Sequence, residues 1–166
     1  IPVINAMSAE SHPCEILGDL YALSKDRIDF MSDEYLYVGP NGNVGYSYLE
    51  AAKILGLKFV QCCPKGFEMP GAEIEPDLAH AIRGKDIILT DCNYKAAGSF
   101  EDYQITSDIM SMANDGAILN PCPPFIRGRE VSDEVIESEH FVGYDFKASL
   151  LRIEQAIILY CMGNLQ

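Results

Sequence analysis

A glycine-rich turn is the first segment of the sequence whose residue types fit ligand binding. Glycines at positions 39, 42 and 45 follow the apolar run Leu36-Tyr37-Val38 and precede a helical pattern. Glycine permits positive φ values and close approach of a ligand, and the following helix offers unpaired N–H groups to an anion. The side chains of Asn43 and Ser47 add polar groups that fit a carboxylate. The segment predicts an anion site after a strand, and a purely structural tight turn is the alternative.

Two established phosphate-binding patterns do not fit this segment. A P-loop requires Gly-Lys-Ser or Gly-Lys-Thr, and a dinucleotide site requires G-x-G-x-x-G with an acidic residue after the second strand. Here the spacing is G-x-x-G-x-x-G, and the second apolar run ends in Cys62-Cys63-Pro64-Lys65. The missing acidic residue disfavours NAD, while an NADP- or nucleotide-binding module stays open as an alternative.

A histidine stands at the start of a predicted helix, in Ser11-His12-Pro13-Cys14-Glu15. A helix N-terminus disfavours the imidazolium form, so a neutral His12 is placed to donate one N–H to a carbonyl and polarise it. The alternative is a capping or surface residue. The pattern predicts a group that acts on a carbonyl only if other site residues lie beside it.

Two further polar segments follow apolar runs. Asp91 comes directly after the run that ends at Thr90, where an acidic side chain can meet a cationic group. Cys122 lies in the proline-rich segment 119–125, whose prolines remove N–H donors and leave carbonyls free to accept from a ligand amide. No base stands beside Cys122 in the sequence, which favours a structural or substrate-lining thiol over a nucleophile.

The elements that would position these residues alternate along the chain. Continuous apolar runs predict strands over residues 36–38, 59–63, 86–90, 117–120 and 141–144. Helical periodicity lies over residues 46–55, 75–82 and 103–113, and two further helices open and close the chain at about 11–25 and 148–163. Apolar runs without alternation are typical of strands covered on both faces. The pattern predicts an α/β, Rossmann-like three-layer domain with a mostly parallel sheet of about five strands and flanking helices.

The composition limits the partners and the location. With 12 basic and 25 acidic residues, a net charge of −13 and no basic stripe, the chain is not expected to bind nucleic acid. No apolar run approaches the roughly 20 residues of a membrane-spanning helix. No secretory signal and no zinc-ligand spacing occur, so reduced thiols and a cytoplasmic location are expected. The chain opens at Ile1-Pro2 inside an apolar segment, which predicts a piece of a longer protein.

Read in order, these pieces resemble the second, amino-acid-binding domain of the aspartate/ornithine carbamoyltransferase family. His12-Pro13 is similar to the start of the family's HPxQ helix, and residues 38–47 to the GDxNN…S strand-turn-helix of the ornithine branch. Residues 64–67 resemble PKGY, Thr90-Asp91 resembles TD, and residues 120–123 are similar to HCLP. The resemblance covers nearly the whole chain and is closer to the ornithine branch.

The resemblance implies transfer of a carbamoyl group from carbamoyl phosphate to the amine of an amino acid, without a metal or organic cofactor. It implies that His12 is catalytic and hydrogen-bonds the carbamoyl carbonyl, while the carbonyls of Cys122 and Pro123 orient the carbamoyl NH₂. The remaining assignments are Glu15 and Arg152 for carbamoyl phosphate, and Asn43, Ser47, Asp91 and Lys95 for the amino acid. A homotrimer of the full-length chain is also implied.

The sequence departs from the family pattern at several positions. Glu15 replaces a glutamine, Asn120 replaces a histidine, and Arg152 is only near the closing-helix arginine. Residues 95–98, Lys-Ala-Ala-Gly, replace the ornithine-binding SMG, and Lys95 would suit an acidic or neutral co-substrate. These departures leave open a non-catalytic, carbamoyltransferase-like subunit.

The family's phosphate-binding STRTR segment, which belongs to its first domain, has no counterpart in residues 1–166. We therefore expect residues 1–166 to form one amino-acid-binding domain that is inactive alone. Its opening and closing helices would dock on the absent N-terminal, carbamoyl-phosphate-binding domain.

Overall fold

The chain folds around a five-stranded parallel sheet, in a computed structural model that describes residues 1–163 except the side chains of residues 94, 95 and 97. The strands are β1 (Glu34–Val38), β2 (Lys58–Cys62), β3 (Glu73–Ile74), β4 (Ile87–Thr90) and β5 (Ile118–Pro121). Their order is β3-β2-β1-β4-β5, and every neighbouring pair is parallel. The order reverses between β1 and β4, so the carboxyl ends of these two strands form the crevice where open α/β sheets bind ligands.

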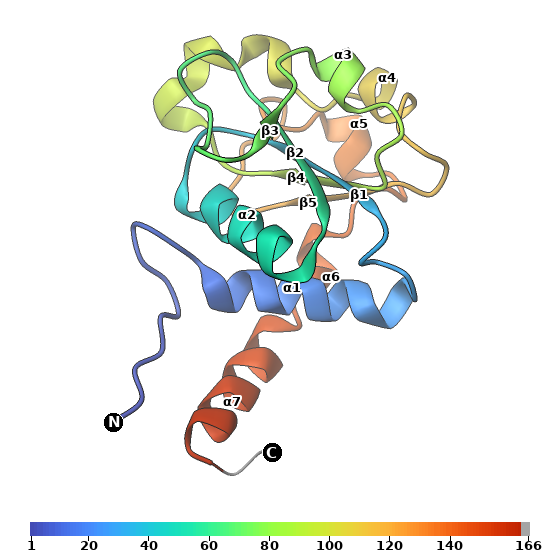
Figure 1. Ribbon diagram of the computed structural model, residues 1–166. Coiled ribbons are helices and arrows are strands. Elements are labelled where there is room, and N and C mark those ends of the chain that lie inside the picture. The colour runs from blue at the N-terminus through green and yellow to red at the C-terminus, as the bar shows by residue number, and fades with distance from the viewer. Residues whose placement is uncertain (164–166) are drawn as a thin grey trace.

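Helices cover both faces of the sheet, as Figure 1 shows. One face carries α1 (Pro13–Asp26), α2 (Asn43–Leu55) and α6 (Gly143–Lys147), and the other carries α3 (Leu78–Ala81), α4 (Ser107–Met110) and α5 (Asp133–Ile136). In β1, Tyr35 and Tyr37 pack into the first cluster, while Leu36 and Val38 pack into the second. The central strand is buried on both faces, which confirms the predicted three-layer architecture.

The prediction of a strand over residues 141–144 is wrong. Residues 141–144 contain one isolated bridge between Phe141 and Leu119, and α6 begins at Gly143. The aromatic rings of Phe141, Tyr144 and Phe125 pack against one another, with Tyr144 stacked on Phe125 and edge-to-face with Phe141, which explains the apolar pattern without a strand. The fifth strand is instead β3. It has only two residues, one exposed and one partly buried, and so it leaves no apolar signal in the sequence.

The long helices confirm their predictions better than the short ones do. α2 ends where Gly56 adopts a φ of 72°, a left-handed conformation that favours glycine. The helix predicted from about residue 11 begins at Pro13, and His12 is its N-cap. The predictions over 75–82 and 103–113 are too long, because only the single turns α3 and α4 form there.

The closing helix α7 (Leu150–Cys161) packs against α1 and projects away from the sheet (Figure 1). It has no buried residue, and its exposed apolar side chains include Leu151, Ile158, Leu159 and Tyr160. Two 3₁₀ segments, Tyr94–Ser99 and Glu101–Tyr103, follow β4. No helix in the described part of the chain is long and apolar enough to cross a membrane.

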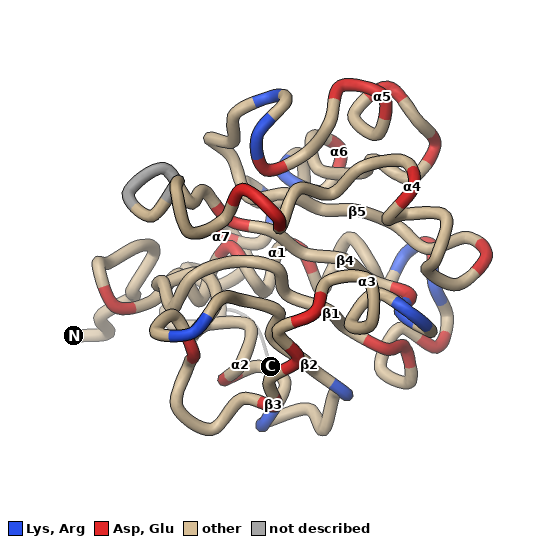
Figure 2. Tube along the Cα trace, turned by 90° about the horizontal axis from the view of Figure 1, so that it is seen from above, with Lys and Arg blue, Asp and Glu red and all other residues tan. Residues whose placement is uncertain are grey.

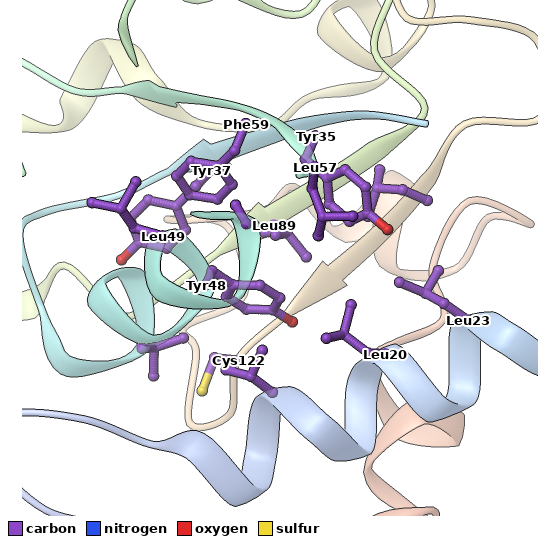
Figure 3. Close-up of a cluster of buried hydrophobic side chains, with 14 of the residues drawn as sticks. Leu20, Leu23, Tyr35, Tyr37, Tyr48, Leu49, Leu57, Phe59, Leu89 and Cys122 are labelled. Carbon is purple, nitrogen blue, oxygen red and sulfur yellow. The ribbon is translucent and has the colours of Figure 1, made fainter. Parts of the chain in front are cut away.

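The core between the sheet and α1 brings the candidate site residues against apolar side chains. Figure 3 shows Leu20 of α1, Tyr48 of α2 and Cys122 after β5 gathered beneath the sheet. The Tyr37 hydroxyl, in the same core, donates to the carbonyl of Pro40, 3.0 Å away. This hydrogen bond ties the strand to the glycine-rich turn that follows it.

Acidic residues outnumber basic ones, but neither kind is gathered on one part of the chain (Figure 2). Figure 2 shows Lys and Arg in separate segments of the trace, with Asp and Glu between them. An anionic ligand would therefore have to be held by a local group of donors, because the net charge of the chain repels it.

Candidate functional site

The predicted site residues meet at the carboxyl ends of β1, β4 and β5, next to the start of α1. A Cβ placed on Gly42 would lie 3.4 Å from Oδ2 of Asp91, so the glycine-rich turn borders that carboxyl group. The thiol of Cys122 lies 3.1 Å from Oε1 of Glu15. Segments from four parts of the sequence therefore converge on one crevice.

The glycine-rich turn is built for close packing rather than for unusual backbone angles. None of Gly39, Gly42 and Gly45 has a positive φ, so the expectation that they use this freedom is wrong. A Cβ on Gly39 would lie 2.9 Å from the ring of Tyr37, and one on Gly45 would lie 2.8 Å from that ring and 2.9 Å from Sδ of Met69. The glycines let α2 start directly against the core tyrosine.

Asn43 and Ser47 hold the segment that leads into α1. Nδ2 of Asn43 donates to the carbonyl of Ser8 (2.8 Å), and its Oδ1 accepts from the N–H of Val44 (3.0 Å). The Ser47 hydroxyl accepts from the N–H of His12 (2.7 Å) and donates to the carbonyl of Asn43 (2.9 Å). Through Ser47, α2 fixes where His12 stands.

His12 forms a pair with Glu15 on the first turn of α1. Nδ1 of His12 lies 2.8 Å from Oε2 of Glu15, and the two side chains are 14% and 12% exposed. The other carboxylate oxygen, Oε1, accepts from Cys122 and from Nζ of Lys147, 2.7 Å away. Glu15 is therefore held from both sides and orients the imidazole.

A buried polar network continues inward from Glu15, and most of its members were not predicted. Lys147 of α6 also contacts both carboxylate oxygens of Asp19, at 3.0 and 2.9 Å. Oδ2 of Asp19 accepts from the Tyr48 hydroxyl and, at 2.9 Å, from Nδ2 of Asn120. The only sequence signal was the spacing of positions 12, 15 and 19, which places three polar groups on one helix face.

The protonation states in this network follow from burial and from Lys147. Burial opposes ionisation of Glu15, yet the charge and hydrogen bond of Lys147 hold the pKa of Glu15 below its usual range. For Asp19, which is almost fully buried, burial outweighs the same partners and raises the pKa. Burial would lower the pKa of Lys147, but the charges of Asp19 and Glu15 raise it. Glu15 is thus a carboxylate and Lys147 an ammonium ion.

Cys122 is a neutral thiol in this environment. Burial, followed by the charges of Glu15 and Asp91, raises the pKa of Cys122 far above that of a free thiol. A thiol of this kind donates weakly and does not act as a thiolate nucleophile. The geometry supports the interpretation of Cys122 as a lining residue, and the peptide bond that follows between Pro123 and Pro124 is cis.

The end of β4 adds an acidic group and unpartnered oxygens. Burial raises the pKa of Asp91, against the hydrogen bond that its Oδ1 accepts from the N–H of Cys92 at 2.7 Å. Three buried oxygens, Thr90 Oγ1, Asn93 Oδ1 and Asn120 Oδ1, have no hydrogen-bond partner among the described residues. Buried acceptors normally have partners, so these strand ends have unused capacity for ligand or water donors.

One predicted residue is not brought into this cluster, and the side chain of another is not described. Arg152 is exposed on α7, and no hydrogen bond or ion pair joins it to the network in the described part of the chain. The side chain of Lys95 lies outside the described residues. Within the described residues, no three His, Cys, Asp or Glu side chains are arranged to hold a metal ion.

Comparison with known proteins shows to which family the chain belongs. The sequence model of "Aspartate/ornithine carbamoyltransferase, Asp/Orn binding domain" matches residues 33–161. The chain belongs to this family. An ornithine carbamoyltransferase of Methanosarcina mazei is 32% identical over 184 residues, covering 98% of this chain and 61% of the relative. One of Chromobacterium violaceum is 30% identical, covering 98% and 59%.

Solved structures give the same answer for the fold of this carbamoyltransferase domain. The ornithine carbamoyltransferase of Burkholderia thailandensis is 27% identical with a TM-score of 0.92, covering all of this chain and 60% of that one. The Thermus thermophilus enzyme is 28% identical with a TM-score of 0.90, covering 97% and 59%. The chain thus spans about 60% of the length of its curated relatives. The family assignment favours the transferase interpretation over a dinucleotide-binding module.

Proposed function

We propose that this domain is the amino-acid-binding part of a carbamoyltransferase that moves the carbamoyl group of carbamoyl phosphate to an amine of an amino acid. The observation that carries the proposal is the convergence of His12, Asp91 and Cys122 at one crevice of a family domain. His12 is the residue next to the reacting carbonyl. Positioning of two substrates supplies most of the rate increase in such a transfer.

Each substrate has its own side of the crevice in this proposal. The carbamoyl group lies against His12 and the main-chain carbonyls of Cys122 and Pro123, with Glu15 behind the imidazole. The amino acid lies between the glycine-rich turn and Asp91, where Asn43 and Ser47 receive its carboxylate and Asp91 its ammonium group. Binding there requires Asn43 to exchange its present contact with Ser8, and Ser47 its donation to the carbonyl of Asn43, for the ligand.

The charges of the described cluster favour a cationic co-substrate. Glu15 and Asp91 border the crevice, Asp19 is buried behind Glu15, and Lys147 is the single cation among these described side chains. An ammonium group is attracted by such a surplus of carboxyl groups, and a second carboxylate is repelled. This favours a diamino acid such as ornithine over the acidic or neutral co-substrate expected from Lys95.

The remaining functional parts are proposed to lie outside residues 1–166. The exposed apolar side chains of α7, with Leu17 and Tyr21 of α1, form a surface suited to docking an N-terminal domain that binds the phosphate. The coverage of about 60% of the relatives leaves room for that domain. The whole protein is proposed to act as a cytoplasmic homotrimer, and this domain alone as inactive.

An activity assay on the whole protein tests the proposal. The protein is incubated with carbamoyl phosphate and, separately, with ornithine, other diamino acids, neutral amino acids and aspartate, while phosphate release and the carbamoylated product are both measured. Transfer to a diamino acid, lost in His12→Asn, is expected. Absence of transfer to every amine would favour the non-catalytic subunit, and transfer by residues 1–166 alone would contradict the need for a second domain.

A further inference from the structure

The unusual feature of this site is the carboxylate that faces His12. Glu15 stands where the family resemblance expects a glutamine, whose amide can donate to or accept from either form of a histidine ring. A carboxylate only accepts. Since Lys147 at 2.7 Å keeps Glu15 ionised, the 2.8 Å contact between Glu15 and Nδ1 of His12 requires a proton on Nδ1.

A neutral imidazole carries one ring proton, so a proton on Nδ1 leaves a lone pair on Nε2. Nε2 of His12 makes no hydrogen bond to any described residue, and the His12 side chain is 14% exposed, so the ring keeps one nitrogen for a ligand. A ring in this state cannot donate from Nε2 to the carbamoyl oxygen. It can accept a proton there.

We infer that Glu15 locks His12 in the tautomer protonated at Nδ1 and thereby makes Nε2 the proton acceptor for the attacking amine. Glu15 is the positioning residue and His12 the catalytic one, in an arrangement that rests on the proposed function. The same logic operates where a buried carboxylate orients the histidine of a hydrolase triad and stabilises the imidazolium that forms.

The transfer balances with this assignment. The unprotonated amine forms a C–N bond to the carbamoyl carbon and gives one proton to Nε2. The C–O bond to the phosphate breaks, and its electron pair leaves with the phosphate oxygen. His12 then returns the proton to the departing phosphate as hydrogen phosphate, so no further reactant is needed.

The charges around His12 are suited to this cycle. Glu15 contacts the ring from α1, and Asp91 at the end of β4 acts on it through its charge. Lys147 of α6 and the Cys122 thiol contact the other carboxylate oxygen of Glu15, and the Lys147 charge opposes a positive charge on the ring. The imidazolium formed during transfer is therefore compensated by acidic groups on two sides.

Nitrogen-15 NMR of the whole protein, labelled in the histidine rings, tests the inference directly. Protonated and unprotonated ring nitrogens resonate in separate ranges, and His12→Asn assigns the signals among the three histidines of the domain. With the ring neutral, the wild type is expected to show the proton on Nδ1 of His12. A proton on Nε2 instead would overturn the inference whatever the variants do.

Variants connect the tautomer with catalysis. Glu15→Gln is expected to populate the tautomer protonated at Nε2 and to lower kcat in proportion to that population, up to about 100-fold, the size of a general-base contribution. Glu75→Gln is the matched control, because it removes the equivalent carboxylate from Nδ1 of His80 on the surface, and it should change neither quantity. A changed tautomer with unchanged kcat would overturn the catalytic role. A wild type without any transferase activity would instead refute the proposed function and leave the tautomer result standing.

Discussion

Lys147 and Asp19 form a two-contact ion pair across 128 residues of sequence, with Nζ at 3.0 and 2.9 Å from the two carboxylate oxygens. The Asp19 side chain is 2% exposed, and Lys147 also reaches Glu15 at 2.7 Å. One buried ammonium ion therefore compensates two carboxyl groups and joins α6 to α1. The contact of Lys147 with Glu15 also keeps Glu15, the residue that orients His12, in its carboxylate form.

Removal of that ammonium ion should be costly. Lys147→Met leaves Glu15 and Asp19 without a cation, and loss of one partner of a buried pair lowers the free energy of unfolding by about 3–5 kcal/mol. Urea unfolding of the whole protein measures the change. Lys58→Met, which breaks an exposed pair with Glu34, is the control and should have little effect. Equal small losses in both variants would show that the network is well hydrated.

The buried tyrosines predict a loss of stability at alkaline pH. Burial raises the pKa of Tyr37 well above 10.0, so above pH 10 the unfolded chain loses the phenol proton while the folded chain retains it. The unfolded state then binds fewer protons, and the free energy of unfolding falls as pH rises. Tyr37→Phe should make this slope shallower, by about 0.7 kcal/mol per pH unit at pH 10 and approaching about 1.4 kcal/mol per pH unit once the unfolded phenol is fully ionised. Denaturant unfolding between pH 9 and 11 measures it.

The control for that slope is Tyr46→Phe, because Tyr46 is 37% exposed on α2. Its slope should match that of the wild type. Tyr37→Phe also loses the hydrogen bond to Pro40, which lowers stability at every pH but leaves the slope unaffected. An unchanged slope in Tyr37→Phe would mean that the folded phenol ionises with the unfolded one.

The strands and long helices could be predicted because each leaves a local pattern. β1, β2, β4 and β5 are continuous apolar runs, since both of their faces are covered. β3 could not be found, because two partly exposed residues carry no periodicity. Residues 103–113 keep helical spacing although only α4 forms, since Ile105 pairs with Val131 in a β-bridge instead.

The candidate site was predictable only where its residues follow strands or start helices. His12, Asp91 and Cys122 occupy such positions, and topology brings them together. The network behind them was not predictable, because Lys147 is far from Glu15 and Asp19 in sequence and lies on α6, whose first two residues were predicted to be part of a strand. The contact that controls the site is long-range and leaves no spacing signal.

The first turn of α2 should not tolerate a methyl group at Gly45. In Gly45→Ala the new Cβ would lie 2.8 Å from the Tyr37 ring, and overpacking of this kind costs about 1–3 kcal/mol. Thermal unfolding should show a lower Tm. Gly98→Ala is the control, because its Cβ would meet nothing within 4 Å and should leave the Tm nearly unchanged. A Tm for Gly45→Ala equal to that of the control would mean that the ring of Tyr37 moves aside freely.

Asp91 should control affinity for the amine rather than the rate of transfer. Its carboxyl group borders the glycine-rich turn, and replacement by an amide removes a charge-assisted hydrogen bond worth about 1.5–3 kcal/mol. Asp91→Asn should therefore raise KM for the diamino acid roughly 10- to 150-fold, with a smaller change in KM for carbamoyl phosphate. Initial rates with each substrate varied in turn separate the two constants. Asp108→Asn, exposed on α4, should leave both unchanged, and equal increases in both KM values for Asp91→Asn would place Asp91 in the support of the whole crevice instead of in amine binding.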